Sequence, residues 1–323
     1  MNSSEQPFVT VVIPALNEER VIGECLQALA GQTYPADRFE VVVVDNGSID
    51  DTARIARESG AVVLDVARRS AYVARNRAIR ETNGDYLAFT DADCVPEASW
   101  IETLVATETR EQTGVVAGHI EYRMTFDSLG NRMLIASRSR DAIRELVCVH
   151  HCAPTGNVLY RRTLLEQYGP FDEQAYGSDV ALSRRLAAAG HPPAFAEEAV
   201  VVHQCDLTSR EYLSRTYWNN RGNALHDSRP VSVGRLLREL AEIPWRPGFR
   251  RVSEIQTAAP DQSRSPFLST WLYAWASRFA AYAGRVSGTV GRMFQRNSTP
   301  SGNCASVPAS GSVEERPSPV QLS

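Results

Sequence analysis

The chain has 323 residues, 43 % hydrophobic and 22 % charged, which is typical of a globular protein and long enough for one large α/β domain. Its net charge of −4 gives no basic field and argues against a nucleic-acid-binding protein. Six scattered cysteines favour a reduced, cytoplasmic setting over a disulfide-rich secreted one. We find no run of about 18 apolar residues and no basic-then-apolar N-terminus, so we predict neither a transmembrane helix nor a signal peptide.

Residues 1–100 alternate between short β-branched runs and stretches with helical spacing. The predicted strands span residues 9–13, 39–44, 62–66 and 85–90. The predicted helices span residues 17–30, 50–59 and 71–81. This order predicts an α/β fold with a parallel, doubly wound sheet and right-handed crossovers, in which ligands bind at the carboxyl ends of the strands.

The rest of the chain has fewer regular elements and changes texture near residue 231. Further strands are predicted at 115–122, 156–160 and 199–203, and helices at 100–109, 178–189, 235–243 and 267–286. Residues 123–152 read as irregular. We therefore expect a main domain over 1–230, a C-terminal helical extension over 231–296, and a disordered tail rich in Ser, Pro and Gly over 297–323.

Two carboxylates follow directly after the fourth predicted strand, Asp91 and Asp93, with Ala92 between them. Carboxylates so spaced can share one divalent cation, and Mn²⁺ and Mg²⁺ both accept such hard oxygen ligands. A bound cation would neutralise charge on a leaving diphosphate. The same residues would also fit a solvated turn that caps a helix.

Other polar residues follow strands at the same predicted edge. Asn17 and Glu18 come after the first strand, and Asp45 ends the second. A carboxylate at Asp45 can accept a hydrogen bond from a nucleobase or a ribose. It would equally suit an Asx turn leading into Gly47.

These motifs and several others occur in the order and spacing of family 2 glycosyltransferases, which the chain resembles over residues 8–226. The matching segments are 11–18 (VVIPALNE), 40–48 (EVVVVDNGS), 51–52, 74–76 (ARN), 84–86 (GDY), 156–162, 169–173 (GPFDE), 178–186 and 201–203 (VVH). The resemblance implies a GT-A fold, with a Rossmann-like, mostly parallel sheet between helices. It also implies an inverting, nucleotide-sugar-dependent enzyme of polysaccharide or glycolipid biosynthesis.

The resemblance also implies roles for individual residues. The donor nucleotide sugar would be bound by Pro14, Ala15, Asn17, Glu18, Asp45, Arg75, Asp91, Ala92 and Asp93. Of these, Arg75 would lie near the base or the diphosphate, and Asp91 and Asp93 would bind the donor ribose and the metal.

Asp179 matches the family's catalytic base. A hydroxyl acceptor becomes a good nucleophile once a base removes its proton, and a single in-line displacement at the sugar C1 inverts the anomeric configuration. Asp179 would also suit a helix N-cap. The family usually has Glu before this residue, whereas this chain has Ser178, a departure that bears on the positioning of the acceptor.

Three basic or imidazole residues near the end of the matched region could contact the diphosphate or its metal. His203 ends a buried strand, where it could join Asp91 and Asp93 as a metal ligand or be purely structural. Arg215 and Arg221 lie on an expected helix, and their guanidinium groups suit a diphosphate or a solvated helix face.

The segment from Cys148 to Cys152 contains His150 and His151 but no second pair of ligands, so it does not fit a structural zinc site. The resemblance places this segment close to the donor sugar. His150, His151, Gly156 and Asn157 are therefore expected to form the acceptor pocket.

The helix predicted from residue 267 has an apolar, aromatic stripe that includes Leu272, Trp275 and Phe279, with arginines along one edge up to residue 292. This stripe suits contact with a membrane surface, packing on the main domain, or a dimer contact. A membrane contact through 267–292 would make the protein peripheral on the inner face of the cell membrane.

The predicted partners are a nucleotide-sugar donor and a hydroxyl acceptor, which could be a glycan, a lipid-linked sugar or a small molecule. Two other functions fit the sequence less well. A sugar nucleotidyltransferase needs a Gly-rich first loop with a basic residue for the triphosphate, and residues 14–18 are neither Gly-rich nor basic. A non-catalytic nucleotide-sugar or glycan-binding protein would not need Asp179 together with Asp91 and Asp93.

Overall fold

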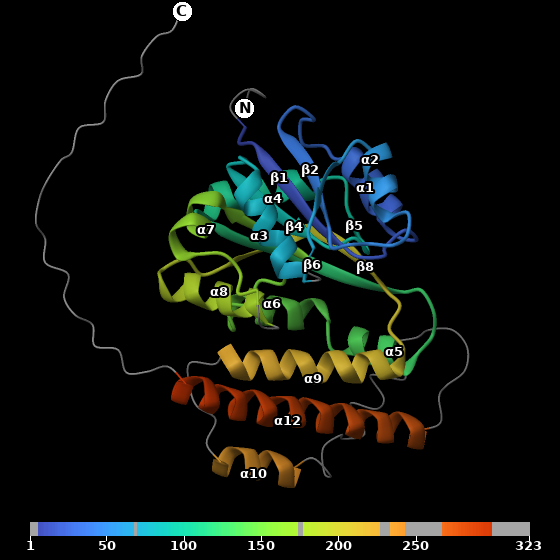
Figure 1. Ribbon diagram of the computed structural model, residues 1–323, viewed down its shortest axis with the longest axis vertical. Coiled ribbons are helices and arrows are strands. Elements are labelled where there is room, and N and C mark those ends of the chain that lie inside the picture. Colours follow the sequence, from blue (N-terminus) through green and yellow to red (C-terminus); the bar gives the residue numbers. More distant parts are fainter. Residues whose placement is uncertain (1–5, 68–69, 174–176, 227–232, 243–266, 299–323) are drawn as a thin grey trace, which may run out of the picture.

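The computed structural model describes residues 6–67, 70–173, 177–226, 233–242 and 267–298 (Figure 1). Almost all of the expected 297–323 tail lies outside these residues. The centre of the molecule is an eight-stranded sheet with the order β3-β2-β1-β4-β7-β6-β8-β5. Its strands are β1 (Val9–Ala15), β2 (Phe39–Asp45), β3 (Val62–Asp65), β4 (Tyr86–Thr90), β5 (Cys94–Pro96), β6 (Val115–Met124), β7 (Asn157–Arg161) and β8 (Ala194–Cys205).

The N-terminal half of the sheet has the predicted parallel arrangement. β1 pairs in parallel with β2 and β4, and β2 pairs in parallel with β3. The intervening helices are α1 (Ile22–Ala30), α2 (Thr52–Glu58) and α3 (Ala71–Glu81). The expected α/β fold, with a mostly parallel sheet between helices, is therefore confirmed.

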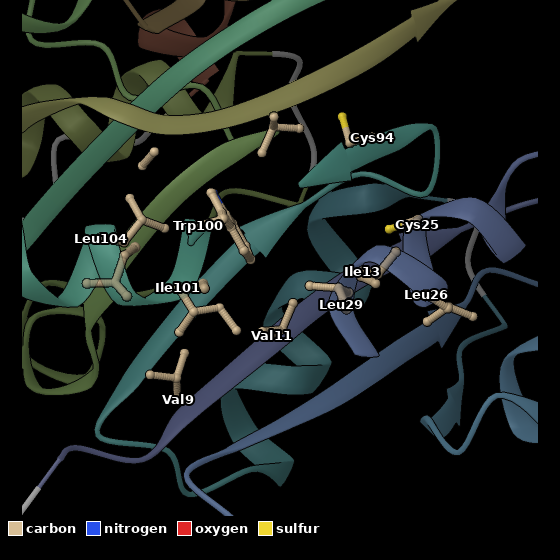
Figure 2. Packing of buried hydrophobic residues seen from close by; sticks show 14 of the residues in the cluster. Val9, Val11, Ile13, Cys25, Leu26, Leu29, Cys94, Trp100, Ile101 and Leu104 are labelled. Atoms are coloured by element: carbon tan, nitrogen blue, oxygen red, sulfur yellow. The ribbon is translucent and has the colours of Figure 1, made fainter. Parts of the chain in front are cut away.

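Hydrophobic side chains cover both faces of this sheet, which is why its strands are apolar almost throughout. On one face Val9, Val11 and Ile13 of β1 pack with residues of α1 and of α4 (Trp100–Glu111), as Figure 2 shows. On the other face Val12 packs with residues of α3, α7 (Arg162–Tyr168) and α8 (Ser178–Ala188). The sheet edge that carries the polar residues is thus held between two separate cores.

Strand directions are mixed in the C-terminal half of the sheet, where β7 and β5 run opposite to the other strands. β7 runs antiparallel to both β4 and β6, while β8 runs parallel to β6 and antiparallel to β5. The short strand β5 follows β4 after a tight turn, and its Cys94 is paired with His203 of β8. This pairing brings the residues after β4 next to the end of β8.

Two local predictions were wrong. The helix expected from residue 17 begins at Ile22, because Asn17 has a φ of 58° and its side-chain oxygen accepts from the Ile49 backbone N–H. Residues 123–152 are not irregular, since they contain α5 (Leu129–Ala136) and α6 (Arg140–Cys148), each with a serine side chain as its N-cap.

Beyond the sheet lie α9 (Ser209–His226), α10 (Val233–Glu242) and α12 (Phe267–Ser298), and α12 runs alongside α9 (Figure 1). The helix α12 buries a face of small residues: Thr270, Ala274, Ser277, Gly284 and Gly288. A Cβ at Gly288 would lie 2.2 Å from the Arg221 carbonyl oxygen of α9, so the two backbones are very close. Among the described helices, none combines the length and apolar character needed to cross a bilayer.

Candidate active site

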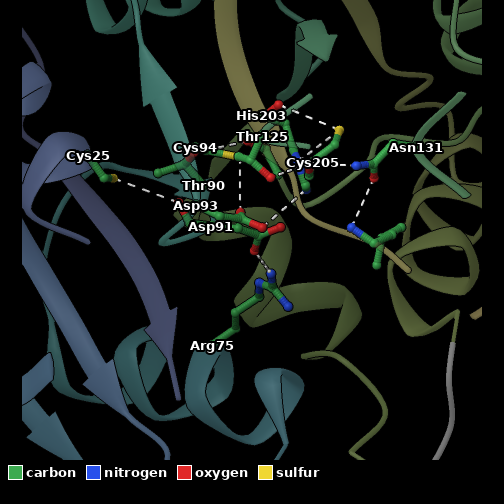
Figure 3. Close-up of polar contacts among 12 residues, drawn as sticks. Cys25, Arg75, Thr90, Asp91, Asp93, Cys94, Thr125, Asn131, His203 and Cys205 are labelled. Carbon is green, nitrogen blue, oxygen red and sulfur yellow. Dashed lines mark hydrogen bonds and ion pairs between the residues drawn. The ribbon is translucent and has the colours of Figure 1, made fainter. Parts of the chain in front are cut away.

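The residues after β4 meet the end of β8 in a cluster of possible metal ligands (Figure 3). The Asp93 carboxylate oxygen Oδ2 lies 3.4 Å from Nε2 of His203, and Cys94 offers a third potential ligand atom. Burial raises the pKa of the Cys94 thiol well above its usual value, and a thiol is a soft ligand that Mn²⁺ and Mg²⁺ do not favour. Carboxylate and imidazole therefore remain, a donor set that fits Mn²⁺ or a similar divalent cation.

Asp91 has a different environment from Asp93. Its Oδ1 accepts a hydrogen bond from Nη2 of Arg75 at 2.6 Å, and the Arg75 side chain is only 4 % exposed (Figure 3). Its other oxygen, Oδ2, faces Gly156, where an added Cβ would lie 3.3 Å away. The structure thus uses Arg75 to orient Asp91, and among the described residues it groups only Asp93, Cys94 and His203 at metal-binding distance.

Two cavities adjoin this cluster. One, of about 350 Å³, is lined by residues of the loops after β1 and β2 together with the cluster, and we call it the donor-side cavity. Its lining includes Pro14, Ala15, Glu18, Asn46, Asp91, Ala92, Asp93, His203 and Arg215. Most of the residues expected to bind the donor therefore surround one space.

The second cavity, of about 340 Å³, lies towards α8 and α9, and we call it the acceptor-side cavity. Its lining includes Tyr72, Tyr122, Arg138, Leu146, Gly156, Asp179, Asn219 and Asn223. Asp91, His203 and Arg215 line both cavities. The two spaces consequently meet at the acidic cluster.

Negative charge accumulates on the donor side. Burial, together with Asp93, Asp206 and Asp91, raises the pKa of Glu18 to about 7. Burial also raises the pKa of Asp93, and the nearby His203 opposes that shift. Such crowded carboxylates would be relieved by a bound cation.

Asp179 lies in the first turn of α8 and points into the acceptor-side cavity. The N-cap of this helix is Gly177, so the N-cap interpretation of Asp179 was wrong. The Tyr72 hydroxyl donates to its Oδ1 at 3.1 Å. The preceding Ser178 is buried, and its hydroxyl accepts from the backbone N–H of Asp172, so it braces the loop before the helix and does not face the cavity.

Several expected site residues lie outside both cavity linings. His150 is exposed, and its Nε2 lies 3.7 Å from Oε1 of Glu145. Neither His150 nor His151 lines the acceptor-side cavity, whereas Cys152 does. Asn157 is fully buried, and its side chain bonds Trp100 and the His119 and Ala199 carbonyls. The Asn157 side chain therefore connects β7 to α4, β6 and β8.

Three more predicted donor contacts are also engaged elsewhere. The Arg221 guanidinium lies 5.2 Å from the Trp218 ring centroid. Asp45 accepts from the backbone N–H of Ser48, the Asx turn considered above, while Asn17 bonds Ile49. The neighbouring Asn46 lines the donor-side cavity instead of Asp45.

Other residues of the two cavities have no clear signal in the sequence. Tyr72 lies two residues before the matched Ala-Arg-Asn segment, and its position one helical turn before Arg75 is the only signal for it. Arg138, Asn219 and Asn223 come from segments that match no motif. These residues are brought to the site by tertiary packing of α5, α6 and α9.

Comparisons with known proteins agree with this geometry. Residues 10–169 match the model of glycosyl transferase family 2. Over 300 residues the chain is 29 % identical to the glycosyltransferase AglE of Haloferax volcanii, covering 88 % of this chain and 97 % of that protein.

Solved structures share the fold. The mannosyltransferase PcManGT from Pyrobaculum calidifontis, solved with GDP-Man and Mn²⁺, superposes with a TM-score of 0.59 at 22 % identity, covering 88 % of each chain. Staphylococcus aureus TarS 1-349 with UDP-GlcNAc gives a TM-score of 0.50 at 17 % identity, covering 90 % of this chain and 92 % of that one.

The sheet and the helices around it form a GT-A-type fold. The chain belongs to glycosyl transferase family 2, as its sequence motifs implied, and it is an enzyme of that family.

Proposed function

We propose that this enzyme is an inverting glycosyltransferase that moves a sugar from a nucleoside-diphosphate donor to a hydroxyl acceptor, assisted by Mn²⁺ or Mg²⁺. The observation that carries the proposal is the junction of the two cavities. The possible metal ligands Asp93 and His203 line the donor-side cavity, and Asp179 lines the acceptor-side cavity. A displacement needs its leaving group and its base on opposite sides of the reacting carbon.

On the donor side, Asp93 and His203 would hold the cation, with Asp91 close by. When bound, the cation neutralises charge on the leaving diphosphate. Arg215 is exposed, lies close enough to Asp93 to influence its pKa, and lines both cavities, so its guanidinium can reach the diphosphate from α9. The family 2 pattern and the GDP-Man and Mn²⁺ complex of PcManGT support this arrangement.

On the acceptor side, Asp179 would take the proton of the attacking hydroxyl. The bond between the acceptor oxygen and the sugar C1 forms as the bond from C1 to the diphosphate oxygen breaks, which inverts C1. Tyr72 holds Oδ1 of Asp179, which leaves Oδ2 available for the acceptor hydroxyl. Tyr72 is therefore a positioning residue for the base.

The outer face of α12 supports a peripheral contact with the inner face of the cell membrane. Its buried face consists of small residues, while Leu272 and Phe279 are 50 % and 48 % exposed. The helix contains arginines and no acidic residue, which suits an anionic bilayer. Sedimentation with phosphatidylglycerol vesicles tests this: the protein should pellet with them, Phe279→Ser should weaken pelleting, and no pelleting contradicts the contact.

A donor screen tests the reaction itself. The purified protein is incubated with uridine, guanosine and thymidine diphosphate sugars, with Mn²⁺ or with a chelator, and released nucleoside diphosphate is measured. The proposal predicts metal-dependent release from one donor class. Donor binding without release from any member of the panel would favour a binding protein.

A further inference from the structure

The acceptor-side cavity contains a cation that the proposed reaction does not use. Arg138 lies in the short connection between α5 and α6, and its half-buried side chain lines this cavity but not the donor-side cavity. Arg215, the other arginine of the lining, lines both cavities and contacts the diphosphate in the proposed mechanism. Arg138 is therefore the cation specific to the acceptor side.

Three arginines that lie near Arg138 in the sequence have acidic partners. Arg132 pairs with Asp127, Arg140 lies 3.5 Å from carboxylate oxygens of Glu121 and Glu197, and Arg144 lies 3.3 Å from Glu197. Within the part of the chain that the structure describes, Arg138 has no hydrogen-bonding or ion-pair partner for its guanidinium group. A guanidinium has five N–H donors, so this side chain retains its full capacity to bind an anion.

The backbone presents Arg138 in a defined position. Its N–H donates to the Ile135 carbonyl at 3.0 Å, and the adjacent Ser139 caps α6 by accepting from Ala142. Burial raises the pKa values of Tyr122 and Cys152, and the charge of Arg138 opposes both shifts. The positive field of Arg138 thus acts on two walls of the cavity.

The acidic groups of the cavity do not compete for this cation. Asp91 is already paired with Arg75, and Asp179 is held by Tyr72 and is needed as the base. Apolar side chains, Ile120 and Leu146, line the same cavity as Arg138. The cavity thus combines a free guanidinium, suited to the geometry of a phosphate, with an apolar wall.

We propose that Arg138 binds a phosphate group carried by the acceptor, so that the acceptor is a phosphate-bearing hydroxyl compound. This inference rests on the proposed function for the identity of the cavity as the acceptor site. The phosphate could belong to a soluble sugar phosphate or to a lipid-linked one, because both present the same oxygens to the guanidinium. Arg138 would then determine specificity without touching the reacting atoms.

Binding of phosphate probes tests the proposal. Dissociation constants are measured by calorimetry for glucose 1-phosphate, decyl phosphate and neutral methyl glucoside, with Mn²⁺ and a nucleoside diphosphate filling the donor-side cavity. At least one phosphate probe should bind the wild-type protein more tightly than methyl glucoside. The Arg138→Gln variant should weaken that probe about tenfold or more, since a charge-assisted contact is lost.

Arg140→Gln is the matched control, since Arg140 is two residues away, exposed and not part of the lining. It should leave phosphate binding unchanged. Tighter binding of decyl phosphate would identify a lipid-linked source, and tighter binding of glucose 1-phosphate a soluble one. Phosphate binding that is absent from the wild type, unchanged in Arg138→Gln, or equally weakened in Arg140→Gln would overturn the proposal.

The proposed function can fail separately. If no nucleoside diphosphate binds with Mn²⁺, the donor assignment is wrong, and the phosphate titrations are repeated in an Arg215→Gln background. That variant removes the cation shared with the donor side. A remaining dependence of phosphate binding on Arg138 would then support the phosphate site alone.

Discussion

The buried guanidinium of Arg75 is fixed to the carboxylate of Asp91, with 2.6 Å between Nη2 and Oδ1. Arg75 lies in the middle of α3, and Asp91 is the first residue after β4. The helix that crosses between β3 and β4 therefore sets the orientation of an acidic residue at the junction of the two cavities.

Removing this guanidinium should cost both stability and activity. We expect Arg75→Met to lower the free energy of unfolding by about 1–3 kcal/mol, because Asp91 is left without its partner in a half-buried position. The control Arg77→Met, on the same helix, removes an exposed pair with Glu81 and should cost less than about 0.5 kcal/mol. Urea denaturation measures both values, and equal losses would contradict the role of Arg75.

Substitutions of the proposed metal ligands should separate Asp93 and His203 from their neighbour Cys94. We expect Asp93→Asn and His203→Asn each to weaken Mn²⁺ binding about tenfold or more in the presence of nucleoside diphosphate. Cys94→Ser should retain binding, because Mn²⁺ favours oxygen and nitrogen ligands over a soft thiol. Electron paramagnetic resonance titration of Mn²⁺ measures the affinities. Loss of binding in Cys94→Ser with retention in His203→Asn would reverse this assignment.

Glu18 should make the stability of the metal-free protein depend on pH. Its pKa is raised from 4.5 to about 7, so the folded state binds the proton more tightly than the unfolded state. Stability contributed by the protonated carboxyl is therefore present below pH 4.5 and is lost as the pH rises towards 7. In chelator, Glu18→Gln should be more stable than the wild type at pH 8, relative to their difference at pH 4.5. An identical difference in urea denaturation at both pH values would contradict this prediction.

Two Gly→Ala substitutions should have opposite effects on stability, because only one of the two glycines lies in the contact between α9 and α12. Gly288→Ala should destabilise the protein by about 1–3 kcal/mol, because the new methyl group would lie 2.2 Å from the Arg221 carbonyl oxygen. Gly23→Ala, in α1, meets nothing within 4 Å and should stabilise by about 0.5 kcal/mol. Thermal and urea unfolding compare the two, and a neutral Gly288→Ala would show that the helices separate easily.

The sequence predicted the first half of the fold well because each of its elements is locally encoded. Strands β1 to β4 are apolar runs that end in turn residues, and the intervening helices have regular spacing. The helices α5 and α6 were missed, since their buried residues contact distant segments. For example, Asn131 bonds the Cys205 carbonyl. Contacts of this kind have no signature in a local window.

The candidate site residues that the sequence located best are those whose backbone positions the motifs determine. Asp91, Asp93, Asp179 and His203 lie at strand or helix ends that the motifs locate, and the cavities contain all of them. The motifs did not reveal where side chains point, so buried Asn157 and ring-stacked Arg221 were assigned to a ligand. Tyr72 and Arg138 depend on packing across α3, α5, α6 and α8.

The most direct test of the account compares Asp179→Asn with Asp141→Asn. Both aspartates lie in the first turn of a helix, but Asp141 is exposed and lines neither cavity. With the cognate donor and Mn²⁺, release of nucleoside diphosphate should fall about 10²- to 10⁴-fold in Asp179→Asn, while its nucleoside diphosphate affinity matches the wild type. Asp141→Asn should be fully active. Turnover retained by Asp179→Asn, with donor binding intact, would contradict the assignment of Asp179 as the base.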